Sequence, residues 1–369
     1  MKRKITTEIR NHRGDLSPRA PHFGVWGFPT SAVSYLCGHI FFFLFLPLCL
    51  LAVESPEEIQ KELDSAEAQF ERAKGMFNPW YAGPLVTPSA SMMPPGYANI
   101  QPYFFLNGAY ASFNEDRKSM ALPHNLYSAS IISPIQIGVT TSTDIVVSPP
   151  SAVANWQDGN SGCGFGDLGI TYGFSIFKET LYIPKFKFTI GETFPTGKYQ
   201  KLKSTGLNGT GAGSFQTQFG LAMGKVIWWT YPHVVNTRLF VGYTIATVVD
   251  VSGFNAYGGG YGTDGRVRPG NKWTVDLGGE LTLTQHWVLA MDFVYVAQNQ
   301  TKFHGHPGIS ASGEIASVGS GYNDNFSLAP AIEYNFNDSL AILWGVQFSV
   351  YGRNSSNFIN GQFSVEYTW

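Results

Sequence analysis

The stretch Phe363-Ser-Val-Glu-Tyr-Thr-Trp369 places a large apolar side chain at every second position, with Ser, Glu and Thr between them. Successive side chains of an extended chain point to opposite sides. A period of two therefore predicts a β-strand with one apolar and one polar face.

The same alternation recurs from Ala98 onward. Val346, Phe348 and Val350, for example, alternate with Gln347 and Ser349. We predict strands at 98–113, 127–139, 144–156, 166–176, 185–193, 214–228, 235–250, 272–283, 287–300, 325–336, 340–351 and 358–369. The connections after the odd-numbered strands are long and rich in Gly, Ser and Asn, whereas those after the even-numbered strands are short. Such segregation of loop length predicts an antiparallel β-barrel with short turns at one rim.

The composition separates this barrel from a soluble one. Charged residues make up 14% of the 369 residues and aromatic residues 15%, and the net charge is −2. A soluble domain carries roughly 25% charged residues. The polar strand faces hold Gly, Ser, Thr and Asn, which suits a lumen, and the apolar faces suit lipid. Strands cross a bilayer only as a closed barrel. We therefore predict an all-β fold, a transmembrane antiparallel β-barrel of about twelve strands over residues 98–369. A net negative charge argues against nucleic acid as a partner.

The residues before the barrel divide into three segments. Residues 1–53 combine a basic start with an apolar core, 32–52, and predict a signal segment for export; a transmembrane helix is the alternative. Residues 54–76 predict a short amphipathic periplasmic helix, because Ser55-Pro56-Glu57-Glu58 has a capping Ser and Pro in the first turn. Residues 77–97 are rich in Pro and predict an extended linker.

Aromatic residues at strand ends predict contacts with the membrane. Trp228, Trp229 and Trp287 fit an interfacial girdle. The final strand, with Phe363, Tyr367 and Trp369, resembles the signal by which barrel-insertion machinery recognises its substrates. We expect this machinery and outer-membrane lipids as partners, and the outer membrane of a Gram-negative bacterium as the location. The oligomeric state is left open.

Isolated charges occupy the polar strand faces. A basic side chain that faces lipid costs about 2–4 kcal/mol near the midplane, and an acidic one costs less. We therefore expect a lumen-facing set of Glu192, Arg238, Asp276, Glu280, Asp292, Glu333 and Glu366. Acids outnumber bases in this set, which favours a lumen that prefers cations or neutral solutes. The alternative is that these residues pair with one another and plug the barrel.

Two short motifs carry a resemblance to a known family. Gly164-Phe-Gly-Asp167-Leu opens one predicted strand, and Pro195-Thr-Gly-Lys198 follows the next. Together they resemble the family named for the meta-pathway of phenol degradation. The resemblance covers roughly residues 100–369 in layout, but its specific motifs span only about 165–199. It implies an outer-membrane barrel that passes hydrophobic or aromatic compounds, and it implies no enzyme.

We expect passive passage or uptake of small solutes. One alternative is a closed structural or adhesive barrel that presents long loops, and the least favoured is an outer-membrane lipid hydrolase. Nucleophilic catalysis is not indicated by the sequence. His304-Gly-His306 could form at most a weak surface metal site, so we expect no metal and no cofactor.

Overall fold

The computed structural model describes residues 55–76, 80–83, 85–227 and 233–369. The predicted export segment and two girdle residues, Trp228 and Trp229, lie outside the described residues. The chain divides into two units at residues 61 and 62, so the helix and the barrel are described separately.

Helix α2, Pro56–Met76, begins as the sequence predicts. The Ser55 Oγ accepts the N–H of Glu58 at 3.3 Å, and the Glu58 carboxylate accepts the N–H of Ser55 at 3.0 Å. This reciprocal cap satisfies donors that the first turn of a helix leaves free. No helix in the described part of the chain is both long and apolar enough to cross a membrane.

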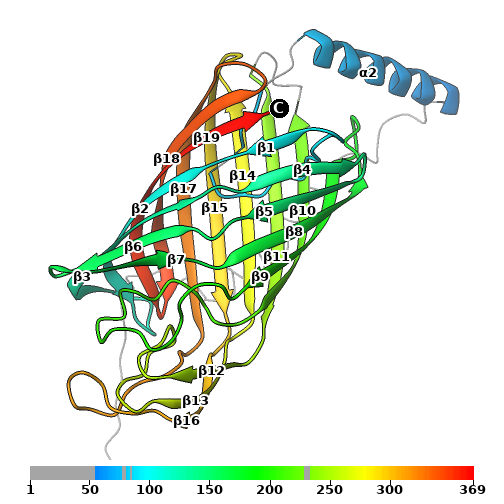
Figure 1. Ribbon diagram of the computed structural model, residues 1–369. Helices are drawn as coiled ribbons and strands as arrows, with labels where there is room; N and C mark the ends of the chain where they lie inside the picture. Colours follow the sequence, from blue (N-terminus) through cyan, green and yellow to red (C-terminus); the bar gives the residue numbers. More distant parts are fainter. Residues whose placement is uncertain (1–54, 77–79, 84, 228–232) are drawn as a thin grey trace, which may run out of the picture. The chain divides into compact units, whose positions relative to one another are not determined.

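The remaining elements are strands, which Figure 1 shows side by side. Their bounds are β1 Ala98–Ile100, β2 Tyr103–Phe113, β3 Ser119–Ile132, β4 Ile135–Thr140, β5 Thr143–Ser148, β6 Ala152–Gln157, β7 Asn160–Phe165, β8 Leu168–Phe177, β9 Lys185–Phe194, β10 Gln216–Ile227, β11 Val235–Ala246, β12 Val249–Ser252, β13 Asp264–Arg268, β14 Lys272–Thr282, β15 Trp287–Gln298, β16 Lys302–His306, β17 Asn323–Asn335, β18 Leu340–Arg353 and β19 Ser355–Thr368.

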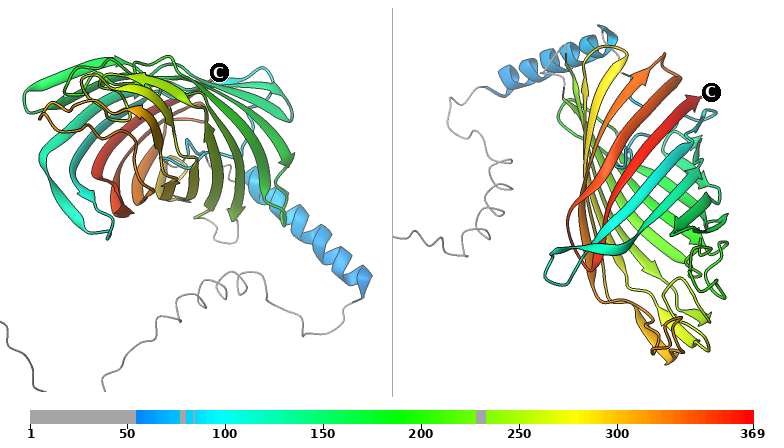
Figure 2. Two further views of the ribbon diagram at one scale, coloured as in Figure 1. Left: turned by 90° about the horizontal axis from the view of Figure 1, so that it is seen from below. Right: turned by 90° about the vertical axis from the view of Figure 1, so that its left-hand side faces the viewer.

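The strands close into a twelve-stranded antiparallel barrel, which confirms the predicted fold class. Closure comes from β1, which pairs with β4 on one side and with β19 on the other. Viewed from below, the strands surround an interior (Figure 2). The first four barrel strands are each broken in two, as β1–β2, β3–β4, β5–β6 and β7–β8.

The four breaks lie next to one another and form a crease across the wall. Pro102 is at the first break, Pro134 at the second, and Pro149 and Pro150 at the third. Proline cannot donate to a sheet ladder, so it interrupts strands where it occurs. Beyond the crease, β7 pairs with β6 alone among the described strands, whereas β8 pairs with β5 and β9. The edge of β7 therefore lacks a strand neighbour.

The prediction of long loops is wrong at two connections. The loop expected at 114–126 is short, because β3 begins at Ser119. The loop expected at 157–165 is a tight turn followed by β7, with Asp158 at φ 49° and Gly159 at φ 76°. Asp-Gly is the preferred pair for a two-residue hairpin turn, because both positions need positive φ. The long connections that remain are 195–215, 247–271 and 299–322, and the last two contain the small sheet β12-β13-β16.

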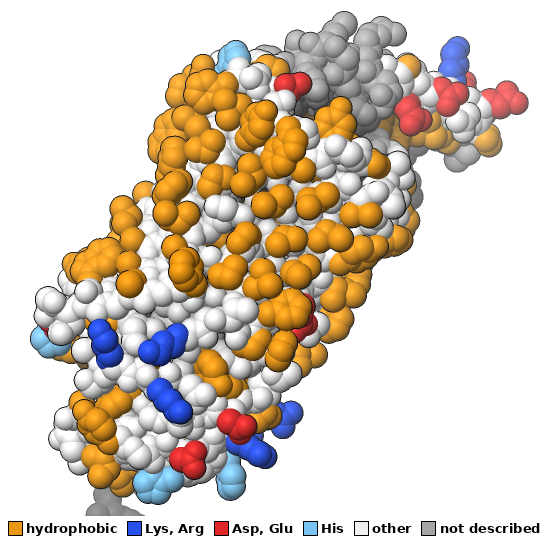
Figure 3. Space-filling model, in the orientation of Figure 1, with side chains coloured by type: hydrophobic (Ala, Val, Ile, Leu, Met, Phe, Trp, Pro, Cys, Tyr) orange, Lys and Arg blue, Asp and Glu red, His pale blue; other side chains and the backbone are white. Residues whose placement is uncertain are grey.

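Large apolar side chains cover the outer face of the barrel (Figure 3). They include Leu106, Phe174, Leu221, Leu277, Leu289 and Phe293, all more than a third exposed. A closed barrel with an apolar outside and a polar inside spans a bilayer with its backbone groups satisfied. The fold and this surface are those of an outer-membrane protein of Gram-negative bacteria.

Candidate functional site: the barrel interior

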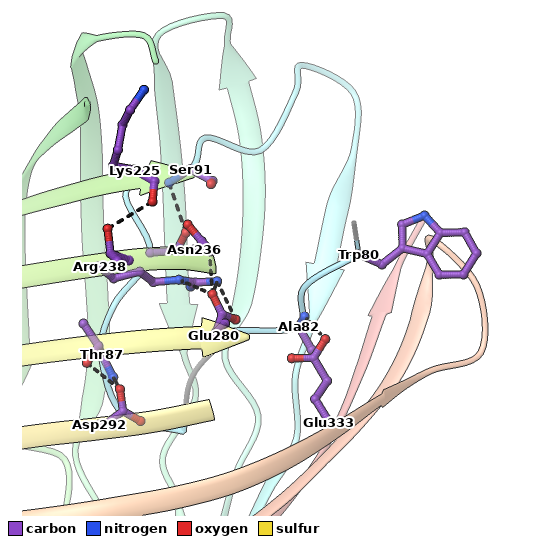
Figure 4. A network of polar contacts seen from close by, with 12 residues as sticks. Trp80, Ala82, Thr87, Ser91, Lys225, Asn236, Arg238, Glu280, Asp292 and Glu333 are labelled. Carbon is purple, nitrogen blue, oxygen red and sulfur yellow. Dashed lines mark hydrogen bonds and ion pairs between the residues drawn. The ribbon is translucent and has the colours of Figure 1, made fainter. Parts of the chain in front are cut away.

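The segment before the first strand lies inside the barrel, and three wall carboxylates hold it. The N–H of Ala82 donates to Glu333 Oε1 at 2.7 Å. Asp292 accepts the N–H groups of Val86 and Thr87 at 3.0 and 3.3 Å and the Thr87 hydroxyl at 2.6 Å. Asp144 accepts a long bond from the next stretch of the segment, at 3.5 Å from the N–H of Met93. We call residues 80–83 and 85–93 the lumen segment. Figure 4 shows its contacts with the wall.

Apolar contacts of the lumen segment are few and small. Leu85 packs against a cluster that includes Ala290, Ala329 and Leu343, and Ala90 packs against Ala222 and Phe240. Lysines complete the attachment: Lys185 Nζ donates to Ser91 Oγ at 2.9 Å, and Lys187 Nζ lies 3.5 Å from the Ser91 carbonyl oxygen. The segment is therefore held mainly by polar bonds to the wall. Sequence reasoning described it as an extended linker and missed this position, because its irregular Pro-rich pattern gives no periodicity to orient it.

Arg238 and Glu280 form a buried ion pair in the interior of the barrel. The guanidinium donates from Nε and Nη2 to the carboxylate, both at 3.0 Å, and the Glu280 side chain has no exposed surface. Asn236 donates to the same carboxylate. A Cβ on Gly83 of the lumen segment would lie 3.1 Å from Arg238 Nη1, so the segment passes directly over this guanidinium.

Two further members of the expected lumen set lie in the interior. Asp276 is 3% exposed, and its buried Oδ1 has no hydrogen-bond partner among the described residues. Glu366 accepts a hydrogen bond from Asn99 of β1. The interior also holds a pair that the sequence analysis did not select, Lys187 Nζ with Asp144 Oδ2 at 2.7 Å. Strand parity in β9 would have placed Lys187 on the inward face, because its neighbours Phe186 and Phe188 share the opposite one.

The structure differs from expectation at Glu192. Its cross-strand neighbour in β8 is Ile170, which is 37% exposed on the outer face, and Ile190 on its own strand is 41% exposed. Directly opposite residues of a sheet share a face, so Glu192 points outward. The hydroxyl of Thr217 on β10 donates to its carboxylate at 2.6 Å, which supplies a partner outside the lumen.

A cavity of about 620 Å³ lies between the lumen segment and the wall. Tyr81 and Ser89 line it from the segment, and Gln101, Asn236 and Arg238 line it from the wall. The Tyr81 hydroxyl, the Gln101 amide nitrogen and the Asn236 amide oxygen have no hydrogen-bond partner among the described residues. These groups suit hydrogen-bonding solutes or water, although apolar residues such as Val86 and Met93 also line the space. No group of three or more residues suited to hold a metal ion occurs in the described part of the chain.

The aromatic residues chosen for the girdle lie on the outer face where they are described. Trp287 is 38% exposed and packs edge-on against Tyr334 and Trp344 beside the turns. Phe363, Tyr367 and Trp369 are 40%, 48% and 52% exposed.

The two motifs that carried the family resemblance fold against each other. Asp167 accepts the N–H of Gly197 at 2.8 Å through Oδ1 and the N–H of Ala212 at 2.8 Å through Oδ2. Thr210 Oγ1 donates to the carbonyl of Phe165 at the end of β7 at 2.7 Å. We call residues 195–215, pinned in this way, the clasp loop. It lies against β7, where the wall has no further strand.

Comparisons with known proteins support the fold. No family model matches the chain, and no curated protein matches its sequence. An outer membrane channel from Pseudomonas putida F1 superposes with a TM-score of 0.61 at 12% identity, over 77% of this chain and 100% of that chain. The translocator domain of the autotransporter NalP from Neisseria meningitidis gives a TM-score of 0.41 at 11% identity, over 83% of this chain and 97% of that one. A mutant of the monoaromatic hydrocarbon channel TodX gives 0.36 at 12% identity, over 75% and 90%. The first likeness shows a shared barrel fold, and the other two are too low to carry an argument.

Proposed function

We propose that this chain is a passive outer-membrane channel for small solutes, and that its own lumen segment keeps it closed. The observation that carries the proposal is the attachment of that segment. It is bound through backbone N–H groups of Ala82, Val86 and Thr87 to carboxylates of the wall. Water can replace such bonds when the segment leaves, whereas an apolar core would resist hydration.

The experiment compares three purified barrels in liposomes. One is full length, one lacks residues 55–76, and one lacks residues 55–96, which removes the lumen segment as well. We expect rapid swelling with small sugars only for the last. Heat-modifiable migration on a gel, from unboiled to boiled samples, tests that each barrel is closed. If the shortest barrel is closed but does not swell, the structural or adhesive alternative is favoured.

The finer solute class, hydrophobic or aromatic compounds, is supported by the resemblance and by the interrupted wall. The lumen is lined by charged side chains, which disfavour apolar solutes. At the edge of β7, by contrast, Phe165 is 70% exposed, and Phe194 and Phe215 stack edge-on with ring centroids 6.0 Å apart at the base of the clasp loop. These rings provide an apolar surface beside the edge of β7, which the clasp loop covers. Swelling with a small aromatic alcohol, compared with a sugar of similar size, separates the two solute classes.

A further inference from the structure

The clasp loop presents three cations without internal partners. Lys198, Lys201 and Lys203 are exposed, and no ion pair joins them to a carboxylate in the described residues. Leu202, between two of them, is 8% exposed and lines a cavity of about 550 Å³ under the loop. Leu202 therefore anchors the loop, and the ammonium groups of the three lysines are exposed to solvent.

Three of the neighbouring carboxylates are already engaged, and a fourth, Asp264 on β13 opposite Ser252, is exposed. Both oxygens of Asp167 accept backbone N–H groups of the clasp loop. Asp158, in the turn before β7, lies 2.7 Å from His124. Asp250 on β12 pairs with Arg266 on β13 at 3.0 Å, and β12 adjoins the loop because its Ser252 carbonyl accepts the N–H of Lys201. The three lysines outnumber Asp264, so the surface of the loop keeps a net positive charge, which favours an external anion as its partner.

The loop also adjoins the lipid-facing surface. The N–H of Lys198 donates to Thr210 Oγ1 at 3.3 Å, and the same hydroxyl donates to the carbonyl of Phe165. Phe165 is exposed on the outer face, as is Phe215 at the other end of the loop. Figure 3 shows Lys and Arg side chains gathered on the same face beyond the end of the apolar belt, with uncharged surface between them and the belt. The lysines and the exposed aromatic rings thus belong to one loop and its direct contacts.

We propose that this surface binds the phosphorylated glycolipid of the outer leaflet, lipopolysaccharide. In this lipid the phosphate groups lie between the acyl chains and the sugars. In the barrel the lysines lie next to the exposed aromatic rings, so one lipid molecule would reach both. Ammonium groups bind phosphate as point charges, and anionic membrane lipids attract clusters of basic residues. The aromatic residues Phe165 and Phe215 would pack against the acyl chains. A free phosphate ion would use the lysines but gain nothing from these rings.

The test uses the full chain refolded in detergent, titrated with fluorescent lipopolysaccharide. The variant K198Q/K201Q/K203Q is compared with K118Q/R268Q/K302Q, which removes the same charge from other exposed positions of the outer loops. Heat-modifiable migration verifies folding of both. We expect the clasp-loop variant to bind at least about tenfold more weakly and the control to change by about threefold or less.

Two further arms identify the ligand. Dephosphorylated lipopolysaccharide should bind the unaltered chain about as weakly as intact lipopolysaccharide binds the clasp-loop variant. Inorganic pyrophosphate at equal concentration should not displace the lipid. The proposal is overturned if both variants lose affinity equally, if neither does, if removal of phosphate has no effect, or if pyrophosphate displaces the lipid completely.

Discussion

Thr87 and Asp292 lie 205 residues apart in sequence, yet the Thr87 hydroxyl donates to Asp292 Oδ1 at 2.6 Å inside the barrel. Asp292 also accepts two backbone N–H groups of the lumen segment. This single side chain therefore accepts three of the hydrogen bonds that join the segment to the wall. Hydrogen bonds to a charged acceptor contribute about 1.5–3 kcal/mol each, and neutral ones contribute less. Asp292 is therefore the residue whose charge most directly keeps the segment in place.

Asp292→Asn should loosen the lumen segment by about 1–3 kcal/mol, which raises its undocked fraction about 5- to 150-fold. Single-channel recordings in planar bilayers would show more frequent opening. Asp276→Asn is the matched control, because Asp276 lies on the neighbouring strand, is also buried, and makes no hydrogen bond to the described residues of the segment. Equal opening by the two variants would contradict the assigned role of Asp292.

The open lumen should prefer cations. In the barrel without residues 55–96, Asp292 and Glu333 lose the N–H donors that the segment supplied, and their charge faces the pore. Interior acids without a basic partner also include Asp276 and Glu366, whereas Arg238 and Lys187 are paired with Glu280 and Asp144. A reversal potential measured in a salt gradient should have the sign of cation selectivity. Anion selectivity would rule out this electrostatic account.

Arg238 and Glu280 should depend on each other for stability. Arg238→Met leaves a carboxylate buried without its partner, which costs about 3–5 kcal/mol. The double variant Arg238→Met/Glu280→Met removes both charges and should recover most of that loss. The urea midpoint of the folded band on a gel measures both. If the double variant is as unstable as the single one, packing rather than the ion pair accounts for the effect.

The α2 cap gives a pH dependence that can be measured in a peptide of residues 55–76. Hydrogen bonds from the Ser55 N–H and hydroxyl lower the pKa of Glu58. A lowered pKa means that the cap stabilises the helix above the carboxylate's ordinary range and loses that effect as pH falls. Circular dichroism should show Glu58→Gln to be less helical than the unaltered peptide at about pH 7 and equal to it at about pH 2. Glu62→Gln, beyond the cap, should show a smaller difference at neutral pH.

The period of two predicted the barrel because lipid and lumen impose opposite demands on alternate residues, as at Val346, Gln347 and Phe348. Loop lengths were less predictable, since Asn160 to Phe165 is rich in Gly and lacks an apolar face. Glu192 departs from the expectation that a charge avoids lipid, because it shares the parity of the exposed Ile190. The partner that makes this position tolerable, Thr217, is on another strand and leaves no mark in the local sequence.

The interior could be predicted only in part. Parity identifies which residues face inward, but it does not reveal what occupies the space between them. The lumen segment has neither a helical nor a strand period, and its partners Glu333 and Asp292 lie more than 200 residues away. Nothing local to the segment therefore signals that it lies in the barrel and not outside it.

The clasp loop should depend on Asp167. Asp167→Asn keeps the shape of the side chain but removes the charge that accepts the N–H groups of Gly197 and Ala212. The loss of charge-assisted bonds should free the loop by about 1–3 kcal/mol. Lys198, Lys201 and Lys203 are already exposed, but a released loop adapts more readily to the trypsin active site, so cleavage of intact folded barrels should speed up about tenfold. Asp158→Asn serves as the control, because the carboxylate of that exposed residue pairs with His124 and not with the clasp loop. Similar cleavage rates for the two variants would mean that contacts other than Asp167, such as Thr210 with Phe165, hold the loop against β7.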